Sequence, residues 1–266
     1  MIGYIGNNMA LDYYAAASFY VKEELYGYKT IGRLFHALKE KEVEGIIVPY
    51  FNAKNGIFNN GLYRMDKNHF HIERYIEIDV LLELVGFTTT VTDITEIFVT
   101  KEDYEDAYLS IQKMKHIVKK TFVNNREEAL NLVKSNNQAA VITNHHPHSL
   151  NILRSSLRDE PHQTFAYFLV GTKLKTNGFN NRLMLNLTFH ESQIFSLNDV
   201  LHELMMFGYK CEHIITKPEI KGEEGVFITL NTNLEDEKLK DLFRLLQLKT
   251  AHVSIVGSYY KKLDQE

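Results

Sequence analysis

The chain has 266 residues, 44% of them hydrophobic, which is enough to bury the cores of two domains. Its 30 basic and 34 acidic residues nearly balance, which argues against a polycationic surface for nucleic acid or an anionic membrane. The single cysteine, Cys211, excludes an internal disulfide framework, and no apolar run approaches the roughly 20 residues of a membrane span. The opening MIGYIGNN lacks the basic start of a signal peptide, so we expect a cytoplasmic protein.

Strand and helix patterns alternate along the first half of the chain. We predict strands at Ile2–Ile5, Glu44–Pro49, Ile94–Val99, Ile117–Val123 and Ala139–Thr143, and a long strand or strand pair over His69–Phe87. We predict helices at Ala10–Leu25, Thr30–Lys41, Asp103–Lys115, Glu127–Ser135 and from Pro147 to about Ser156. Thr30 is the expected N-cap of its helix, and residues 52–61, rich in asparagine and glycine, predict a loop.

The second half begins with a turn at Asp159, Pro161 and His162 and a strand at Thr164–Val170. A linker at residues 176–181 separates this strand from a βαββαβ pattern. Its strands are predicted at Leu183–Phe189, Glu212–Lys217, Val226–Asn231 and His252–Tyr259, and its helices at Leu197–Phe207, ended by Gly208, and Glu235–Leu248. Such alternation indicates open α/β sheets followed by a smaller α/β domain.

Polar residues follow several of the predicted strands. In open α/β sheets, ligands bind beyond the carboxyl ends of the strands. Those ends here are rich in asparagine: Gly6-Asn7-Asn8, residues 49–56, Asn124-Asn125-Arg126 and Thr143-Asn144. A polar ligand-binding cleft is one interpretation, and plain turn formation by asparagine and glycine is the other.

The strand at 164–170 carries the most informative segment. Asp159 and Pro161 form a turn, and Phe168-Leu169-Val170 end the strand. This arrangement resembles the prephenate dehydratase family, in which an Asp-x-Pro turn precedes an Asn-x-Thr-Arg-Phe signature and aliphatic residues. The chain has one residue more between turn and strand end, and counting back from Phe168 places Ala166 at the Thr position and Tyr167 at the Arg position.

Four further segments extend the resemblance along the chain: MIGYIG (1–6), IIVPYFNAKNG (46–56), TKP (216–218) and VSIVGSYYK (253–261). The resemblance implies an α/β, two-lobed, periplasmic-binding-protein-like domain over residues 1–178, followed by an ACT regulatory domain over 181–266. Its lobes would comprise residues 1–78 with 162–178, and 79–161. It further implies conversion of prephenate to phenylpyruvate, CO2 and water in phenylalanine biosynthesis, without a cofactor, by a homodimer or homotetramer.

The resemblance also assigns roles to individual residues. A prephenate-like carboxylic acid would bind between the lobes, at the following positions: Gly6, Asn7, Asn52, Gly56, Asn125, Arg126, Tyr167 and Phe168. An amino-acid effector such as phenylalanine would bind the ACT domain at Ser196, Leu197, Thr216 and Pro218. Phe195 replaces the family's Gly and Ile215 its Glu, so we expect this effector site to be degenerate and phenylalanine binding to be weak or absent.

The altered signature leaves the chemistry open. Alanine has no proton to donate, and Tyr167 lacks the charge and the fork of arginine. Thr164, two residues before Ala166, shares its strand face, and a β-bulge would bring it nearer the lost Thr position. Arg126, at a helix start, would replace the lost cation or would be a solvated surface residue. The protein is therefore a divergent lyase or decarboxylase using Thr164 or a water, or an inactive homologue that senses a small ligand.

Two other features give weaker signals. The run His145-His146-Pro147-His148 has a metal-like composition, but no cysteine or acidic ligand lies beside it, and we interpret it as a surface cluster at a helix start. Cys211 has apolar neighbours and is expected to be an inert strand residue. We therefore expect no metal site.

Overall fold

The computed structural model describes residues 1–7, 10–117, 119–144, 149–159, 164–190, 197–217 and 223–262. It divides into two compact units. Unit 1 comprises Met1–Glu77 and Ala166–Glu266, and unit 2 comprises Ile78–Phe165. The chain therefore leaves unit 1 once, builds unit 2, and returns.

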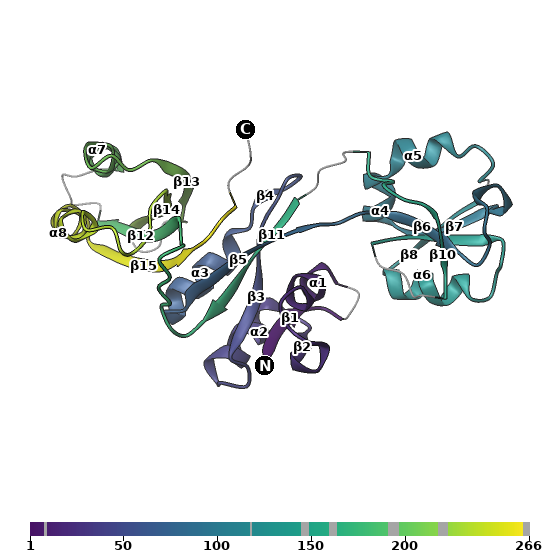
Figure 1. Cartoon of the computed structure of the whole chain (residues 1–266), viewed down its shortest axis with the longest axis horizontal. Coiled ribbons are helices and arrows are strands. Elements are labelled where there is room, and N and C mark those ends of the chain that lie inside the picture. The colour runs from purple at the N-terminus through teal and green to yellow at the C-terminus, as the bar shows by residue number, and fades with distance from the viewer. Residues whose placement is uncertain are drawn as a thin grey trace. The chain divides into compact units, whose positions relative to one another are not determined.

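The first part of unit 1 is an α/β sheet (Figure 1). Its strands are β1 (Ile2–Ile5), β2 (Leu25–Tyr28), β3 (Gly45–Asn52), β4 (Gly56–Ile57), β5 (His71–Asp79) and β11 (Thr164–Gly171). Strand order is β5-β11-β3-β1-β2, with β4 paired to β3. The continuous apolar run of β3 is buried on both faces, as a central strand requires. The helices are α1 (Leu11–Ala17), α2 (Ile31–Lys39) and α3 (Asn59–Asn68).

Side-chain alternation assigns these helices to the two faces of the sheet. Gly3 of β1 faces Leu34 of α2, whereas the ring of the next residue, Tyr4, contacts Tyr13 of α1. Helix α3 joins α2 over the same core, contributing Leu62 and Met65. The predicted N-cap is confirmed, because the Thr30 hydroxyl accepts a hydrogen bond from the Arg33 amide at 3.2 Å.

Two sequence predictions in this region are wrong. The predicted helix Ala10–Leu25 ends at Ala17, and a 3-10 turn at Lys22–Glu24 and strand β2 follow. Here the Ser18 hydroxyl bonds back to the Ala15 carbonyl at 2.7 Å, and β2 pairs in parallel with β1. The predicted loop 52–61 already contains β4 and the start of α3, which the burial of Leu62 and Met65, one helical turn apart, stabilises despite weak local propensity.

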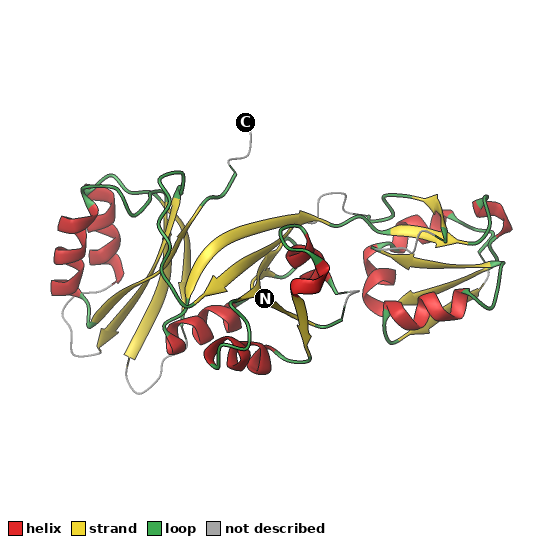
Figure 2. Cartoon of the chain, turned by 60° about the horizontal axis from the view of Figure 1, so that its bottom comes forward, coloured by secondary structure: helices red, strands yellow, loops and turns green. Residues whose placement is uncertain are grey.

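The second part of unit 1 is the predicted βαββαβ unit. It comprises β12 (Arg182–His190), α7 (Leu197–Met206), β13 (Cys211–Thr216), β14 (Glu223–Leu230), α8 (Leu239–Lys249) and β15 (His252–Tyr259). The antiparallel strands lie in the order β13-β14-β12-β15. Helices α7 and α8 lie side by side on one face and close a leucine-rich core (Figure 2). Gly208, with φ +83°, follows α7 as the sequence predicts.

A single point of pairing joins the two sheets of unit 1. Gly257 of β15 pairs in parallel with Ile72 of β5. A Cβ atom at Gly257 would lie 2.5 Å from the Ile72 Cβ, so only glycine allows this approach. The strands thus form one continuous ten-stranded sheet through unit 1.

Unit 2 has a five-stranded sheet in the order β10-β6-β9-β7-β8. Its strands are β6 (Glu83–Gly86), β7 (Glu96–Thr100), β8 (Lys119–Val123), β9 (Ala139–Thr143) and β10 (Asn151–Arg154), with a 3-10 turn at Val91–Asp93. Its helices are α4 (Lys101–Asp106), α5 (Tyr108–Lys113) and α6 (Arg126–Val133). Helices α5 and α6 lie on opposite faces (Figure 1). The strand-pair interpretation of residues 69–87 is confirmed, since β5 and β6 are separate strands.

Two helix predictions in unit 2 need correction. Residues 151–154 form strand β10 rather than the helix predicted up to Ser156, because they pair with β6 and the Asn151 amide bonds the Phe87 and Thr88 carbonyls. Residues 145–148, including Pro147, lie outside the described residues. The helix predicted over 103–115 divides at Ala107, and the Asp159 carboxylate accepts the backbone amides of Leu109 and Ser110 at 2.7 and 3.0 Å.

Within the described residues, no helix combines the length and apolar character that a membrane crossing needs.

Candidate functional site

Strand β11 presents the altered signature as part of a buried strand. Ala166, Phe168 and Val170 alternate into the core between β11 and helices α2 and α3. Ala166 is 1% exposed and Tyr167 is 3% exposed. The positions that resemble the family's Thr and Arg therefore hold a methyl group and an enclosed phenol, neither of which carries a charge.

Phe168 is the centre of an aromatic cluster in unit 1. Its ring centroid lies 4.2 Å from that of Tyr50, 5.2 Å from that of Tyr259 and 6.0 Å from that of Tyr75. Tyr75 in turn stacks on Tyr259 at 5.6 Å. Burial raises the pKa of all three tyrosines, so their hydroxyls stay protonated. Both Phe168 and Tyr167 are buried in unit 1. Their contact with a substrate stays a prediction.

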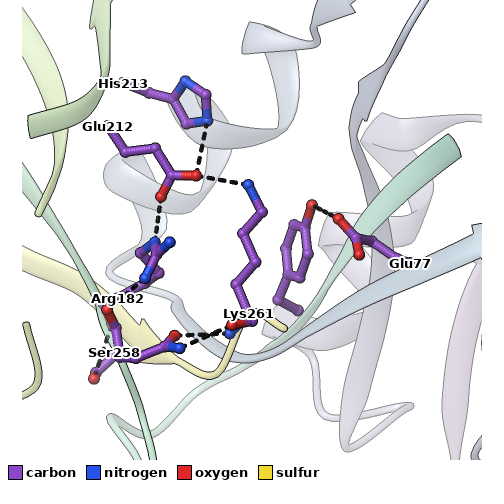
Figure 3. A network of polar contacts seen from close by, with 8 residues as sticks. Glu77, Arg182, Glu212, His213, Ser258 and Lys261 are labelled. Carbon is purple, nitrogen blue, oxygen red and sulfur yellow. Dashed lines mark hydrogen bonds and ion pairs between the residues drawn. The ribbon is translucent and has the colours of Figure 1, made fainter. Parts of the chain in front are cut away.

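An ion-pair network surrounds Glu212 in the same unit (Figure 3). The Glu212 carboxylate accepts hydrogen bonds from Arg182 Nε and, at 2.6 Å, from Lys261 Nζ, and His213 Nε2 lies 3.8 Å away. Lys261 Nζ is also 5.8 Å from the centre of the Tyr75 ring, whose hydroxyl bonds Glu77 at 2.5 Å.

The charges of this network shift two pKa values. Burial alone would raise the pKa of Glu212, but hydrogen bonds from Lys261 and Arg182 outweigh it and lower that pKa. Burial lowers the pKa of His213, partly offset by Glu212. The network thus holds two cations around one carboxylate, and it ties the ends of β12 and β15 to β13.

Sequence reasoning missed this network. Arg182 and Lys261 lie 30 and 49 residues from Glu212 along the chain, so no local spacing announces it. One available signal was an arginine at the start of a leucine-rich strand, since a buried charge at such a position needs a partner.

The predicted glycine and asparagine sites of unit 1 form two turns. Gly6 follows β1 with φ +95°, and its amide bonds the Tyr28 carbonyl at 2.9 Å. The Asn7 carbonyl accepts the Ala10 amide at 3.0 Å and leads into α1. Asn52 and Gly56 pair across the β3–β4 hairpin, where Asn52 Oδ1 accepts the Asn55 amide at 2.6 Å. The Asn52 oxygen is therefore already used in building the turn.

Asp12, in the first turn of α1, is an acid that the sequence did not single out. Its Oδ1 is enclosed and has no hydrogen-bond partner among the described residues. Burial raises the pKa of this carboxyl to about 7, so it keeps its proton in weakly acidic solution and loses it near neutrality.

In unit 2, Arg126 is held by an acidic partner. Its Nε and Nη2 bond the two oxygens of Asp103 at 2.9 and 2.6 Å, and Asp103 is fully buried. The Thr100 hydroxyl also donates to Asp103, at 2.8 Å. A bidentate pair of this kind neutralises the guanidinium. Arg126 is therefore an ion-paired, largely enclosed residue rather than a solvated surface one, and its contact with a substrate carboxylate stays a prediction.

Asn125 caps helix α6. Its Oδ1 accepts the Glu128 amide at 2.8 Å, and the Glu128 carboxylate accepts the Asn124 amide at 2.9 Å, which is a reciprocal capping arrangement. A second buried ion pair, Arg158 with Asp106 at 2.8 Å, fastens the segment that leads toward β11.

Thr164, the predicted proton donor, lies at the start of β11. Its hydroxyl is half-buried and lies 3.4 Å from Asp79 Oδ1, at the long limit of a hydrogen bond. Pro161 and His162 of the preceding turn lie outside the described residues. A catalytic role for Thr164 stays a prediction.

Only two of the four predicted effector positions, Leu197 and Thr216, lie within the described residues. Ser196 and Pro218 lie outside the described residues, and Leu197 packs at the start of α7. The Thr216 carbonyl accepts the Tyr63 hydroxyl at 3.1 Å, and the adjacent Lys217 pairs with Asp66 of α3 at 2.8 Å. The end of β13 is thus bonded to helix α3 of the same unit.

No group of three or more metal-ligating side chains occurs in the parts of the chain that the structure describes. The histidine-rich run at residues 145–148, whose composition is metal-like, lies outside those parts. Burial raises the pKa of the Cys211 thiol, which disfavours the reactive thiolate.

Comparison with known proteins identifies the family. The model of the prephenate dehydratase family matches residues 2–175, about two thirds of the chain. The chain belongs to the prephenate dehydratase family. A curated relative, the bifunctional chorismate mutase/prephenate dehydratase of Aquifex aeolicus, is 22% identical over 280 residues, covering 100% of this chain and 75% of that protein.

Solved structures share the fold of the whole chain. The prephenate dehydratase of Staphylococcus aureus has a TM-score of 0.82 at 16% identity, covering 97% of this chain and 99% of its own. GqqA, described as a novel type of quorum-quenching acylase, has a TM-score of 0.80 at 14% sequence identity, and the match covers 98% of each chain. The Arthrobacter aurescens prephenate dehydratase in complex with L-Phe has a TM-score of 0.77 at 14% sequence identity. The match covers 98% of this chain and 90% of that one. At such identities the likeness shows the fold alone, and the acylase illustrates that one fold serves different chemistries.

Proposed function

We propose that this protein acts in phenylalanine biosynthesis as a prephenate dehydratase-like protein whose first domain, residues 1–178, binds prephenate or a closely related carboxylic acid. The observation that supports this proposal is the family match over residues 2–175, together with a fold shared along the whole chain. No cofactor enters the proposal, and the site of action we propose is the cytoplasm.

The reaction sets clear demands. Prephenate loses its ring carboxylate as CO2, and the electron pair of the broken C–C bond aromatises the ring while the para C–O bond breaks. The departing hydroxide takes one proton and leaves as water, so a proton donor and groups that hold two carboxylates are needed. Removing one preorganised donor of this kind costs roughly 10²–10³ in rate.

In the lyase form of the proposal, Thr164 supplies the hydroxyl that assists the leaving group. In the structure its single proton is directed to Asp79 Oδ1 at 3.4 Å, so the proposal requires the hydroxyl to turn from Asp79 toward the departing oxygen. The substrate-binding residues of this proposal are Gly6, Asn7, Asn52, Gly56, Asn125, Arg126, Tyr167 and Phe168.

The second candidate function is a homologue without turnover that binds or senses the same class of acid. Two observations favour it over the lyase. Ala166 and Tyr167 occupy buried positions where the family has a hydroxyl and a cation. The replacement cation that the sequence suggested, Arg126, is already paired with Asp103.

For residues 181–266 we propose an ACT domain that makes the protein a homodimer or homotetramer. An L-Phe complex of a related fold supports an amino-acid effector, and the effector positions of the proposal are Ser196, Leu197, Thr216 and Pro218. Ile215 is 6% exposed and part of the core, so the carboxylate of the family motif has no counterpart here. We propose weak or absent phenylalanine binding at these positions, and saturable micromolar binding by calorimetry would contradict it.

Incubation with prephenate tests the proposal. Phenylpyruvate release, abolished in Thr164→Val and retained in Thr92→Val at an exposed threonine of unit 2, would support the lyase. Release of a decarboxylated product that keeps its hydroxyl would indicate a decarboxylase. Saturable prephenate binding without any product would support the second candidate. If prephenate is neither bound nor converted, both candidates are refuted.

A further inference from the structure

Unit 1 contains a cavity of about 420 Å³ that none of the predicted sites uses. It opens where β5 and β15 separate beyond their single point of pairing at Ile72 and Gly257. Its walls come from the next residues of β5, from the segment after β11, and from Phe19 and Tyr260. Its size falls within the range of small-molecule sites, about 300–1,000 Å³.

The charge of the cavity is positive. Lys175 pairs with Glu73 at 2.5 Å, which cancels those two charges. Arg74 remains, with its guanidinium carbon 5.5 Å above the centre of the Phe19 ring. Within the described part of the chain, no carboxylate lies within 4.0 Å of this guanidinium. Two cations and one carboxylate leave one net positive charge, carried by a group suited to bind a carboxylate by two parallel hydrogen bonds.

The remaining walls are aromatic. Phe19 is 48% exposed and Tyr260 is 54% exposed, so part of each ring is open to a ligand in the cavity. Tyr75 lines the same cavity from β5. A cavity that combines aromatic faces with one unpaired guanidinium matches a ligand with a ring at one end and a carboxylate at the other.

We infer that this cavity binds a small aromatic carboxylate, with its carboxylate on Arg74 and its ring among the aromatic residues that line the cavity. The site shares no residue with the proposed substrate or effector positions. Tyr75 connects it to the altered signature, because the same ring stacks on Tyr259 at 5.6 Å and contacts Phe168 at 6.0 Å. An occupied cavity would thus stabilise the aromatic cluster that supports β11.

Calorimetric titration of the full-length protein with 3-phenylpropanoate tests the inference. We expect saturable binding, with propanoate (no ring) and phenethylamine (no carboxylate) binding at least about tenfold more weakly. In Arg74→Gln the affinity for 3-phenylpropanoate should fall at least about tenfold, as expected for loss of a charged hydrogen-bonding partner. Arg244→Gln, at an exposed arginine of α8, is the matched control and should bind like the original protein.

The outcomes separate cleanly. Arg74 is exposed, so its variant should fold, and circular dichroism checks this. Equal affinity in Arg74→Gln and the original protein would overturn the inference, even when the acid binds elsewhere in the chain. Absence of saturable binding would also overturn it, and equal affinity for propanoate and 3-phenylpropanoate would overturn the assignment of an aromatic ligand. None of these results depends on turnover of prephenate.

Discussion

Two regions that carry predicted site residues, one in each unit, differ in the interactions that hold those residues. In unit 1, Ala166 and Phe168 lie in an apolar core with an aromatic cluster around Phe168. In unit 2, a cation is present, but Arg126 is bound by Asp103. The first region depends on the hydrophobic effect and the second on electrostatics. The two regions thus show that predicted site residues can be held by apolar packing or by an ion pair within the protein.

The largest expected effect concerns the apolar region. Phe168→Ala removes a ring that is 1% exposed and packed on three tyrosines, and should lower the free energy of unfolding by about 3–5 kcal/mol. Hydrogen exchange measured peptide by peptide should show the loss in unit 1. Phe179→Ala, at a ring 83% exposed, is the control and should change little. A loss below about 1 kcal/mol would mean that the cluster is not a packed core.

A smaller effect is expected for the ion pair. Asp103→Ala removes a fully buried carboxylate that binds the Arg126 guanidinium and should cost about 3 kcal/mol, seen as faster exchange in unit 2. Asp241→Ala breaks an exposed pair with Arg244 and should cost at most about 0.5 kcal/mol. Equal costs in the two variants would show that burial does not distinguish the pairs.

The smallest effect depends on pH. Asp12 has its pKa raised to about 7 in the folded protein, whereas an unfolded aspartate ionises near pH 3.9. Between these values the unfolded chain has released its proton while the folded protein retains it, so stability should decline as pH rises from about 4 to 7. We expect a decline on the order of 2 kcal/mol, since Asp12 is only half-buried as a residue. Denaturation of Asp12→Asn across this range should lack that part of the decline, and parallel pH profiles would contradict the assignment.

The sequence predicted the elements that are determined by local signals, such as hydrophobic periodicity and helix-capping residues. The strand at His252–Tyr259 has the predicted limits, and Thr30 caps its helix as expected. Helix α3 and strand β10 were not predicted, because α3 is stabilised by packing of Leu62 and Met65 rather than by propensity, and β10 depends on pairing with β6.

The candidate site was predictable only as positions along the chain. The family resemblance could place Arg126 at a helix start. Its partner Asp103 lies 23 residues earlier, and no sequence-spacing rule predicts such a pair. The same holds for the cavity beside Arg74, whose walls come from four separate segments. Contacts of this kind depend on tertiary structure, which sequence patterns do not encode locally.

The pairing of Gly257 with Ile72 makes the two parts of unit 1 physically dependent on one another. A protein cut after residue 178 would uncover the β5 edge at Ile72, where Gly257 pairs with it, and would remove Tyr259 from the packing around Phe168. Uncovered strand edges recruit other chains. The C-terminal part is therefore a structural cover as well as an appended module, and the N-terminal part made alone should aggregate.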